Sequence, residues 1–281
     1  MALVVIAIWA AALLQPGHEL EVTFLDVGEG LCVIVRGPTG RTLVMDCGTS
    51  SWRDTELVGG RLAAAYLQSL AVDTIDVAIL SHPHADHVSG MSGLLRAKPP
   101  RLVMDIGAAH GSRLYRKFLQ TVRKTRAAYR RARRGQQIDL GGGAYATVLS
   151  PDPSEHYADL NDHSVVLRIT YGAAAILLAA DAGDETEREI LASGADARAQ
   201  VLQVGHHGSA QSTCDEWLQS VRPEIAVISC ARRSPYGHPS REVVRKLRAF
   251  GARVYCTAWH GAVSITTNGR AIKVKTYGKF Q

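Results

Sequence analysis

The sequence predicts one α+β domain in which two β-sheets pack face to face with helices on the outside. Three observations lead to this prediction. Closely spaced short strands follow residue 18, strands alternate with helices from residue 60 onward, and the same style of strands and helices returns after residue 140. No linker rich in Pro, Gly or Ser interrupts residues 19–281, so these elements belong to a single domain.

The first half opens as an antiparallel meander, because glycine-containing turns separate short apolar runs, and the second half resembles it. Helices are expected where apolar side chains recur at a spacing of three to four residues, at 60–69, 185–192 and 241–250. The expected strands are 20–25, 31–36, 42–45, 75–80, 144–149, 164–170, 174–180, 201–204, 225–229, 254–257, 262–267 and 272–276.

Composition is that of a globular protein able to bury a large core: 281 residues, 46% apolar and 21% charged. Five scattered cysteines without a C-x-x-C pair exclude a zinc ribbon and argue against a disulfide framework. Residues 1–18 form an apolar segment that is too short to span a bilayer alone. We expect the end of a transmembrane helix that begins outside this chain, or a signal-like anchor; a buried core element is the third alternative.

The segment His82-Pro83-His84-Ala85-Asp86-His87 places four potential metal ligands directly after a strand. Imidazole suits zinc, and carboxylate widens the choice to manganese or iron. Pro83 prevents the strand from continuing, so the side chains can converge instead of alternating between faces. Single histidines usually make ordinary hydrogen bonds, but four ligands at this spacing indicate a metal centre.

Further candidate ligands also lie at strand ends. Asp181 follows the apolar run 176–180, where a carboxylate is costly to bury without a cation; its alternative role is the N-cap of the next helix. His206 and His207 follow another strand, and His163 precedes one. Two cations that share a carboxylate use six or seven ligands, which this set supplies.

Four segments carry a specific resemblance to a known family: residues 22–28, 161–168, 205–209 and 236–239. Asp46 and the candidate ligands named above match that family in the same order. The sequence resembles the metallo-β-lactamase superfamily, and more narrowly the C-terminal hydrolase domain of ComEC, the DNA-uptake channel protein of competent bacteria. The resemblance covers residues 20–277 and implies a four-layer αββα sandwich. In ComEC proteins this domain follows membrane helices, which agrees with the apolar N-terminal segment.

The resemblance also implies two divalent ions, zinc or manganese, and their ligands. Three histidines would hold one ion. Asp86 and one member of the pair His206-His207 would hold the second. Asp181 would bridge the two ions, and Asp46 would lie behind the metal loop. Which member of the pair binds the metal stays open. We assign His206 to the metal, with His87 as a further ligand. Asp86 and His207 are assigned catalytic roles. The three histidines of the first ion are His82, His84 and His163.

Two departures from the family bear on this assignment. Gly28-Glu29-Gly30-Leu31 stands where the family often has Gly-Gln-Gly-Asp, so a carboxylate at the rim is displaced or missing. Many ComEC relatives have Asp in place of His84, and a histidine there makes the metal site more complete.

A stretch from 106 to 138 contains no Asp or Glu, although the net charge of the whole chain is only +6. On a helix these cations would form a surface that binds nucleic acid phosphates. A solvated helix, or one facing anionic lipid, is the alternative. The cations are Arg113, Arg116, Lys117, Arg123, Lys124, Arg126, Arg130, Arg131, Arg133 and Arg134, of which the last four are our candidates for substrate binding.

The expected chemistry is attack of a hydroxide, held between the ions, on a phosphodiester. His238 is the catalytic candidate for substrate contact or proton transfer, with a structural hydrogen bond as the alternative. Ser164 and Ser209 are candidates for holding phosphate oxygens, although serine beside glycine is also ordinary loop chemistry.

The leading functional hypothesis is a ComEC-like phosphodiesterase or nuclease that acts on incoming, single-stranded DNA at a membrane, on the extracytoplasmic face of the inner membrane. The alternatives are a stand-alone, secreted or periplasmic hydrolase of a small phosphodiester or other ester, and a non-catalytic module that guides DNA to a channel.

Overall fold

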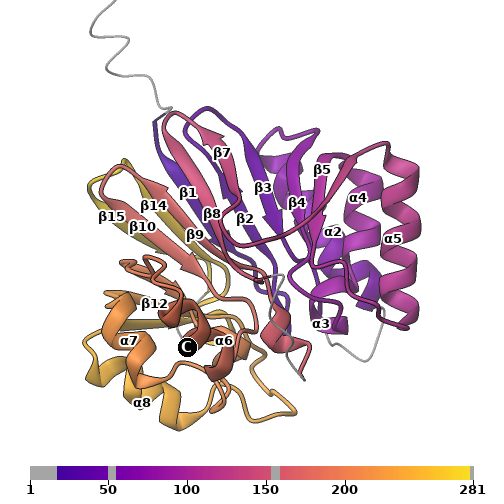
Figure 1. The fold of residues 1–281 in the computed structure, drawn as a ribbon. Coiled ribbons are helices and arrows are strands. Elements are labelled where there is room, and N and C mark those ends of the chain that lie inside the picture. The colour runs from indigo at the N-terminus through magenta and orange to yellow at the C-terminus, as the bar shows by residue number, and fades with distance from the viewer. Residues whose placement is uncertain (1–17, 50–54, 153–158, 279–281) are drawn as a thin grey trace, which may run out of the picture.

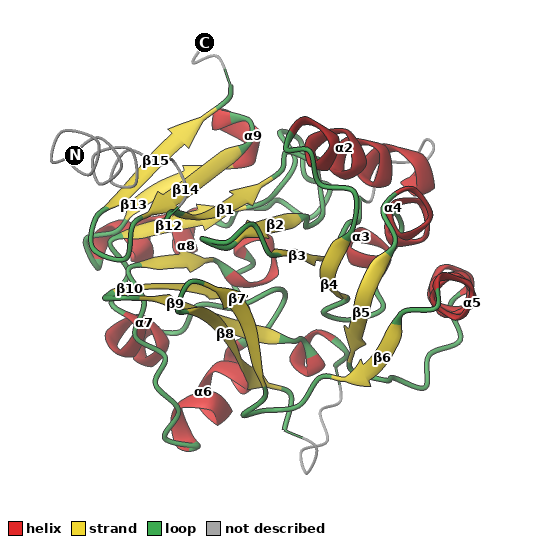
Figure 2. Cartoon of the chain, turned by 90° about the horizontal axis from the view of Figure 1, so that it is seen from above, coloured by secondary structure: helices red, strands yellow, loops and turns green. Residues whose placement is uncertain are grey.

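Two β-sheets face each other across an apolar core, and helices cover the outer face of each sheet (Figures 1 and 2). The computed structural model describes residues 18–49, 55–152 and 159–278. The layers are helix, sheet, sheet and helix, which confirms the predicted sandwich.

The first sheet has the strand order β15-β14-β1-β2-β3-β4-β5-β6. Its antiparallel half runs from β15 to β3, and its parallel half runs from β3 to β6. The strands are β1 (Leu20–Phe24), β2 (Val33–Arg36), β3 (Thr42–Met45), β4 (Ile75–Ile79), β5 (Pro100–Asp105), β6 (Ala128–Arg131), β14 (Val263–Thr267) and β15 (Ile272–Thr276).

The second sheet has the order β13-β12-β11-β10-β9-β8-β7 and repeats this division, since β7 to β10 are antiparallel and β10 to β13 are parallel. Its strands are β7 (Gln137–Gly141), β8 (Ala144–Ser150), β9 (Val166–Tyr171), β10 (Ala174–Leu178), β11 (Val201–Gln203), β12 (Ile225–Ile228) and β13 (Arg253–Cys256).

Three apolar clusters hold the layers together. The central one lies between the sheets and includes Phe24, Leu167 and Ile265. A second cluster, with Trp217, lies under the helices of the second sheet, and a third, with Phe118, lies under those of the first. The helices are α2 (Thr55–Ser69), α3 (Ala85–Val88), α4 (Met91–Ala97) and α5 (Arg113–Thr125) on the first sheet, and α6 (Asp184–Ala192), α7 (Asp215–Val221), α8 (Arg241–Ala249) and α9 (Thr257–His260) on the second.

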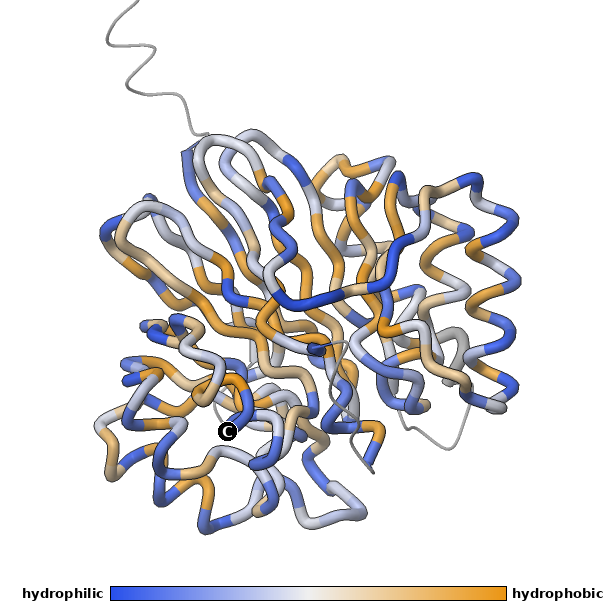
Figure 3. The backbone as a smooth tube through the Cα atoms, viewed as in Figure 1, coloured by the Kyte–Doolittle hydropathy of each residue, from blue (hydrophilic) through white to orange (hydrophobic). Residues whose placement is uncertain are grey.

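Each strand and helix predicted from periodicity is present, with its ends moved by a few residues. The exception is the basic stretch, where the prediction of a helix up to Arg134 is wrong. Helix α5 ends because Arg126 adopts a left-handed backbone (φ 59°), and Ala128–Arg131 then pairs with β5 as the edge strand β6. The chain that follows crosses to the second sheet and is strongly hydrophilic (Figure 3).

The expected N-terminal segment lies outside the described residues, apart from His18. Within the described part of the chain, none of the helices has both the length and the apolar character that a membrane span requires.

Candidate metal centre

Both sheets direct the ends of their strands to one edge, and the candidate ligands gather there. In the first sheet Asp46 follows β3, and the turn with Asp86 and His87 follows β4 and forms α3. In the second sheet Asp181 follows β10 and His207 follows β11. Functional side chains commonly collect at such strand ends.

Asp46 fixes the metal loop from behind. Its left-handed backbone (φ 58°) turns the chain after β3, and its carboxylate accepts hydrogen bonds from Ser81 N at 2.7 Å and from Ser81 Oγ at 2.6 Å. The Nδ1 atom of His87 lies 2.8 Å from the same carboxylate. This contact sets the His87 ring so that its Nε2 atom faces Asp181; carboxylates commonly orient metal-binding histidines by contacting the other ring nitrogen in this way.

Four ligand atoms, from Asp86, His87, Asp181 and His207, lie within 4.8 Å of one another. Asp181 Oδ2 is 3.1 Å from His87 Nε2 and 3.4 Å from His207 Nε2. His207 Nε2 is also 3.3 Å from Asp86 Oδ2. Ligands about 2.0–2.1 Å from a tetrahedral zinc ion are about 3.4 Å apart, so these separations suit a small divalent cation.

Unpaired buried atoms at the same place also fit a cation. His87 Nε2, His207 Nε2 and Asp181 Oδ1 are buried and make no hydrogen bond. Buried polar atoms without partners are costly. A metal ion would satisfy these atoms together, which supports the fit of this donor set to a divalent ion.

The electrostatics of the metal-free group favour cations. Burial alone would lower the pKa of His87, but the negative charges of Asp181 and Asp46 raise it to about 10. Burial also works against protonation of His207, yet Asp181 and Asp86 raise its pKa well above the ordinary value. Burial would raise the pKa of both Asp181 and Asp86, and the two histidines lower both instead. Protons therefore occupy the positions where a metal would bind.

His82 and His84 lie beside this group. His82 Nε2 is 3.0 Å from His84 Nδ1, which in turn is 2.9 Å from Asn161 Oδ1. Burial, together with the positive charge of His87, lowers the pKa of His82 well below its usual value. His82 is therefore neutral, the form in which imidazole binds a metal.

The structure places His207, not His206, in the four-ligand group, so the working assignment of the pair changes. Both residues have left-handed backbones (φ 47° and 54°), which turn the adjacent rings in different directions. His207 Nδ1 lies 2.8 Å from the Ser229 carbonyl oxygen, and this contact leaves Nε2 to face the carboxylates. The ring of His206 lies beside His238 instead, 5.7 Å away between centroids.

The two serines proposed as phosphate contacts have other partners. Ser164 is fully buried, and its hydroxyl lies 3.4 Å from His82 Nδ1, so it supports that ring from inside the protein. Ser209 Oγ accepts a hydrogen bond of 3.3 Å from Gln211 N and shapes its own loop. The loop interpretation therefore suits Ser209, whereas Ser164 contacts a histidine of the metal loop.

A cavity of about 510 Å³ lies at the end of β6, beside the segment that carries the expected ligand His163. His163 lines it together with Arg131 and Arg133. Asn161, two residues before His163, contacts His84 and connects this cavity to the metal loop. The cavity therefore places two of the candidate arginines beside His163.

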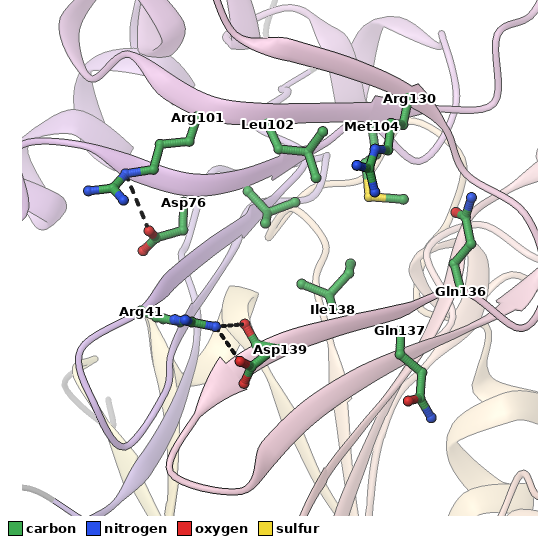
Figure 4. Close-up of a pocket in the computed structure, with 11 residues that line it drawn as sticks. Arg41, Asp76, Arg101, Leu102, Met104, Arg130, Gln136, Gln137, Ile138 and Asp139 are labelled. Atoms are coloured by element: carbon green, nitrogen blue, oxygen red, sulfur yellow. Dashed lines mark hydrogen bonds and ion pairs between the residues drawn. The ribbon is translucent and has the colours of Figure 1, made fainter.

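The other two candidate arginines are placed differently. Arg130 points to the opposite side of β6 and lines a separate pocket of about 420 Å³ with Gln136 and Ile138 (Figure 4). Arg134 forms ion pairs with Asp152, at 3.2 Å, and with Glu189. Arg134 therefore joins loops within the protein and is not available as a substrate contact.

Two groups of the site, the Ser81 side chain and the Ser229 carbonyl group, were not predicted from the sequence. Ser81 contacts Asp46 and both His82 and His87, at 3.0 and 3.3 Å for the two rings. Its position directly before the motif was the available signal. The Ser229 carbonyl gave no signal at all, because any residue type supplies a backbone oxygen.

Gly48 lies against the metal loop and allows a testable prediction. A Cβ atom there would lie 2.1 Å from the Asp86 carbonyl group and 2.2 Å from His87 N. Gly48→Ala must displace this turn, and we expect metal affinity to fall by about 10- to 100-fold. Metal titration measures this. Gly111→Ala is the control, since a Cβ there meets nothing within 4 Å; equal affinities for the two variants would refute the prediction.

Comparison with known proteins agrees with this geometry. The family model described as "Metallo-beta-lactamase superfamily" matches residues 25–232. The chain belongs to the metallo-beta-lactamase superfamily. The resemblance stated from the motifs is therefore confirmed, and the fold with its divalent-metal chemistry follows from membership.

Curated relatives of this superfamily member include competence proteins. ComE operon protein 3 of Bacillus subtilis is 30% identical over 270 residues, which cover 92% of this chain and 34% of that protein. Recombination protein 2 of Haemophilus influenzae is 32% identical over 249 residues, covering 87% and 28%. Competence protein ComA of Neisseria gonorrhoeae is 30% identical, covering 92% and 34%. The chain spans about a third of the length of these relatives.

Solved structures show the same fold at low sequence identity. The metallo-beta-lactamase fold protein YhfI of Bacillus subtilis has a TM-score of 0.59 at 16% identity, with coverage of 89% of this chain and 100% of that one. Tm1679, a metal-dependent hydrolase of the beta-lactamase superfamily, has a TM-score of 0.53 at 13% identity, with coverage of 84% and 95%.

Proposed function

We propose that this metallo-beta-lactamase domain is a phosphodiesterase that cleaves single-stranded DNA. The observation that carries the proposal is the placement of Arg131 and Arg133 on the cavity that His163, a metal ligand expected from the resemblance, also lines. Guanidinium groups pair with phosphate oxygens, and ions beside them would act on the same phosphodiester. The resemblance to the hydrolase domain of ComEC, a DNA-uptake protein, supports DNA as the substrate, and a competence protein is among the relatives.

The residues that would hold metal divide into two sets. Asp86, His87, Asp181 and His207 would hold one ion. His82 and His84 would begin a second site, with His163 as the third ligand expected from the resemblance and Asp181 between the ions. Mixed imidazole and carboxylate ligands suit zinc or manganese.

The protein's own contribution is positioning. When bound, a pair of divalent ions lowers the pKa of a water and stabilises the attacking and leaving oxygens of a displacement. Asp46 and the Ser229 carbonyl fix the rings of His87 and His207 from behind. Ser81 holds His82 and Asp46 together. These contacts keep the ligand atoms in place before substrate arrives.

The test is an activity assay of the purified protein with Mn²⁺ or Zn²⁺. A single-stranded oligonucleotide and bis(p-nitrophenyl) phosphate are each supplied, with EDTA-treated protein as the control. We expect metal-dependent cleavage of both. Cleavage of the small diester alone would favour a small-ester hydrolase, and DNA binding without cleavage of either substrate would favour the guiding module; both results contradict the proposal.

The cavity arginines supply a separate prediction. Arg131→Ala and Arg133→Ala should each lower the slope of log K against log salt concentration for single-stranded DNA by about 0.7, because each removes one phosphate contact. Fluorescence anisotropy over a salt series measures this slope. Arg130→Ala is the matched control, since Arg130 is the neighbour of Arg131 on β6 but lines the other pocket. Equal slopes for all three variants would exclude the cavity as the DNA path.

We also propose that the domain works beside a membrane, at its extracytoplasmic face. The resemblance to ComEC domains, which follow membrane helices, supports a place beside a membrane, and the relatives are about three times as long as this chain. Protease treatment of intact cells and of spheroplasts tests it, and protection of the domain in spheroplasts would place it on the cytoplasmic face.

A further inference from the structure

A buried carboxylate, Glu29, organises the loop opposite the metal ligands. Glu29 lies in the glycine turn between β1 and β2, and its side chain is only 3% exposed. It accepts hydrogen bonds from Ala231 N at 3.0 Å and from Ser234 Oγ at 2.8 Å. The Nδ1 atom of His238 lies 3.1 Å from its Oε1 atom. Three donors from one loop therefore converge on a single carboxylate.

These contacts bring His238 to the metal centre. The loop follows β12 directly after Ser229, whose carbonyl oxygen holds His207. The ring centroids of His238 and His207 are 6.1 Å apart, with an angle of 27° between the planes. The turn that carries Glu29 contacts both sides, since Gly30 O accepts a hydrogen bond from Ser229 Oγ at 2.8 Å and Leu31 N donates one to Asp86 O at 3.1 Å.

Glu29 is ionised in this position. Burial alone would raise its pKa, but the hydrogen bonds from His238, Ala231 and Ser234 outweigh burial and lower it. A buried carboxylate that accepts a bond from Nδ1 of a histidine holds that ring in one orientation. Nε2 is then the free ring nitrogen.

We propose that Glu29 is a positioning residue that holds His238 so that Nε2 donates a proton to the leaving oxygen of the substrate. The inference rests on the proposed phosphodiesterase function. The oxygen of the attacking water forms the new bond to phosphorus. The bond to the leaving oxygen breaks, its electron pair stays on that oxygen, and the oxygen takes the proton from Nε2. The proton lost by the water restores His238 through solvent.

Substrates with different leaving groups test this role. The leaving oxygen of DNA needs a proton, whereas p-nitrophenolate leaves readily without one. We expect His238→Ala to lower kcat for an oligonucleotide by about 100-fold or more and kcat for bis(p-nitrophenyl) phosphate by less than about fivefold. Glu29→Ala should show the same pattern, and Glu29→Gln a weaker one, because its amide oxygen still accepts a bond from Nδ1.

Ser234→Ala tests whether Glu29 only holds the loop together. This substitution removes another hydrogen-bond donor to Glu29 and leaves His238 in place. We expect Ser234→Ala to lower both activities equally or not at all. Equal losses on the two substrates in His238→Ala or Glu29→Ala, at unchanged metal content and thermal midpoint, would overturn the inference. If the unaltered protein cleaves neither substrate, the proposed function fails instead, so the two failures are distinguishable.

Discussion

Replacing Asp181 by asparagine is expected to lower kcat/KM for single-stranded DNA by about 10³-fold, equivalent to about 4 kcal/mol of transition-state stabilisation. Asp181 Oδ2 lies close to both ligand histidines, at 3.1 Å from His87 Nε2 and 3.4 Å from His207 Nε2. Asparagine keeps the shape of the side chain but loses the charge. The substitution therefore removes the carboxylate around which the ligand group is arranged.

The Asp181→Asn experiment measures metal content by mass spectrometry alongside kcat/KM. We expect bound metal to fall together with activity, while the circular dichroism spectrum stays unchanged. Asp196→Asn is the matched control, because its carboxylate is 68% exposed and pairs with Arg168 at the surface. Full activity of Asp181→Asn at normal metal content would exclude Asp181 as a ligand.

The ligands were predictable where sequence neighbours are also neighbours in space. His84, Asp86 and His87 follow one strand within a few residues, so a short turn brings them to the same edge. Asp181 was recognisable because an apolar run ends on a carboxylate that the fold buries. In each case the position of the ligand followed from residues directly adjacent to it in the sequence.

The choice between His206 and His207 was not predictable, because it depends on two consecutive left-handed residues and on a carbonyl group from another strand. Neither feature has a sequence signal. Glu29 is similar: its role depends on His238, which is more than two hundred positions away in the chain. Long-range pairs of this kind become visible only when the fold brings them together.

The basic stretch shows tertiary structure overriding local pattern. Helical spacing holds up to Thr125, and Ser112 caps the start of α5 by accepting a bond from Tyr115 N. Beyond Arg126, all four residues of β6 are exposed, so burial periodicity could not indicate a strand. Pairing with β5 decides the structure of β6 and places Arg130 and Arg131 on opposite sides of it.

Metal affinity is expected to rise steeply with pH. In the metal-free protein the pKa of His87 is raised to about 10, and that of His207 is raised well above the ordinary value. Both imidazoles must lose their protons before they can bind metal. The carboxyl groups of Asp86 and Asp181 have lowered pKa values and stay ionised near neutral pH, so they contribute no pH dependence there.

The sign follows from the protons released. Between pH 5.5 and 7.5 both histidines are protonated without metal, so binding releases up to two protons and the apparent affinity increases by up to about 100-fold per pH unit. Calorimetric titration in buffers of different ionisation enthalpy counts these protons. His82→Asn should leave the count unchanged, because the pKa of His82 is lowered and its ring is already neutral. An affinity independent of pH would show that His87 and His207 do not bind the metal, because proton competition is unavoidable for any ligand that is protonated in its absence.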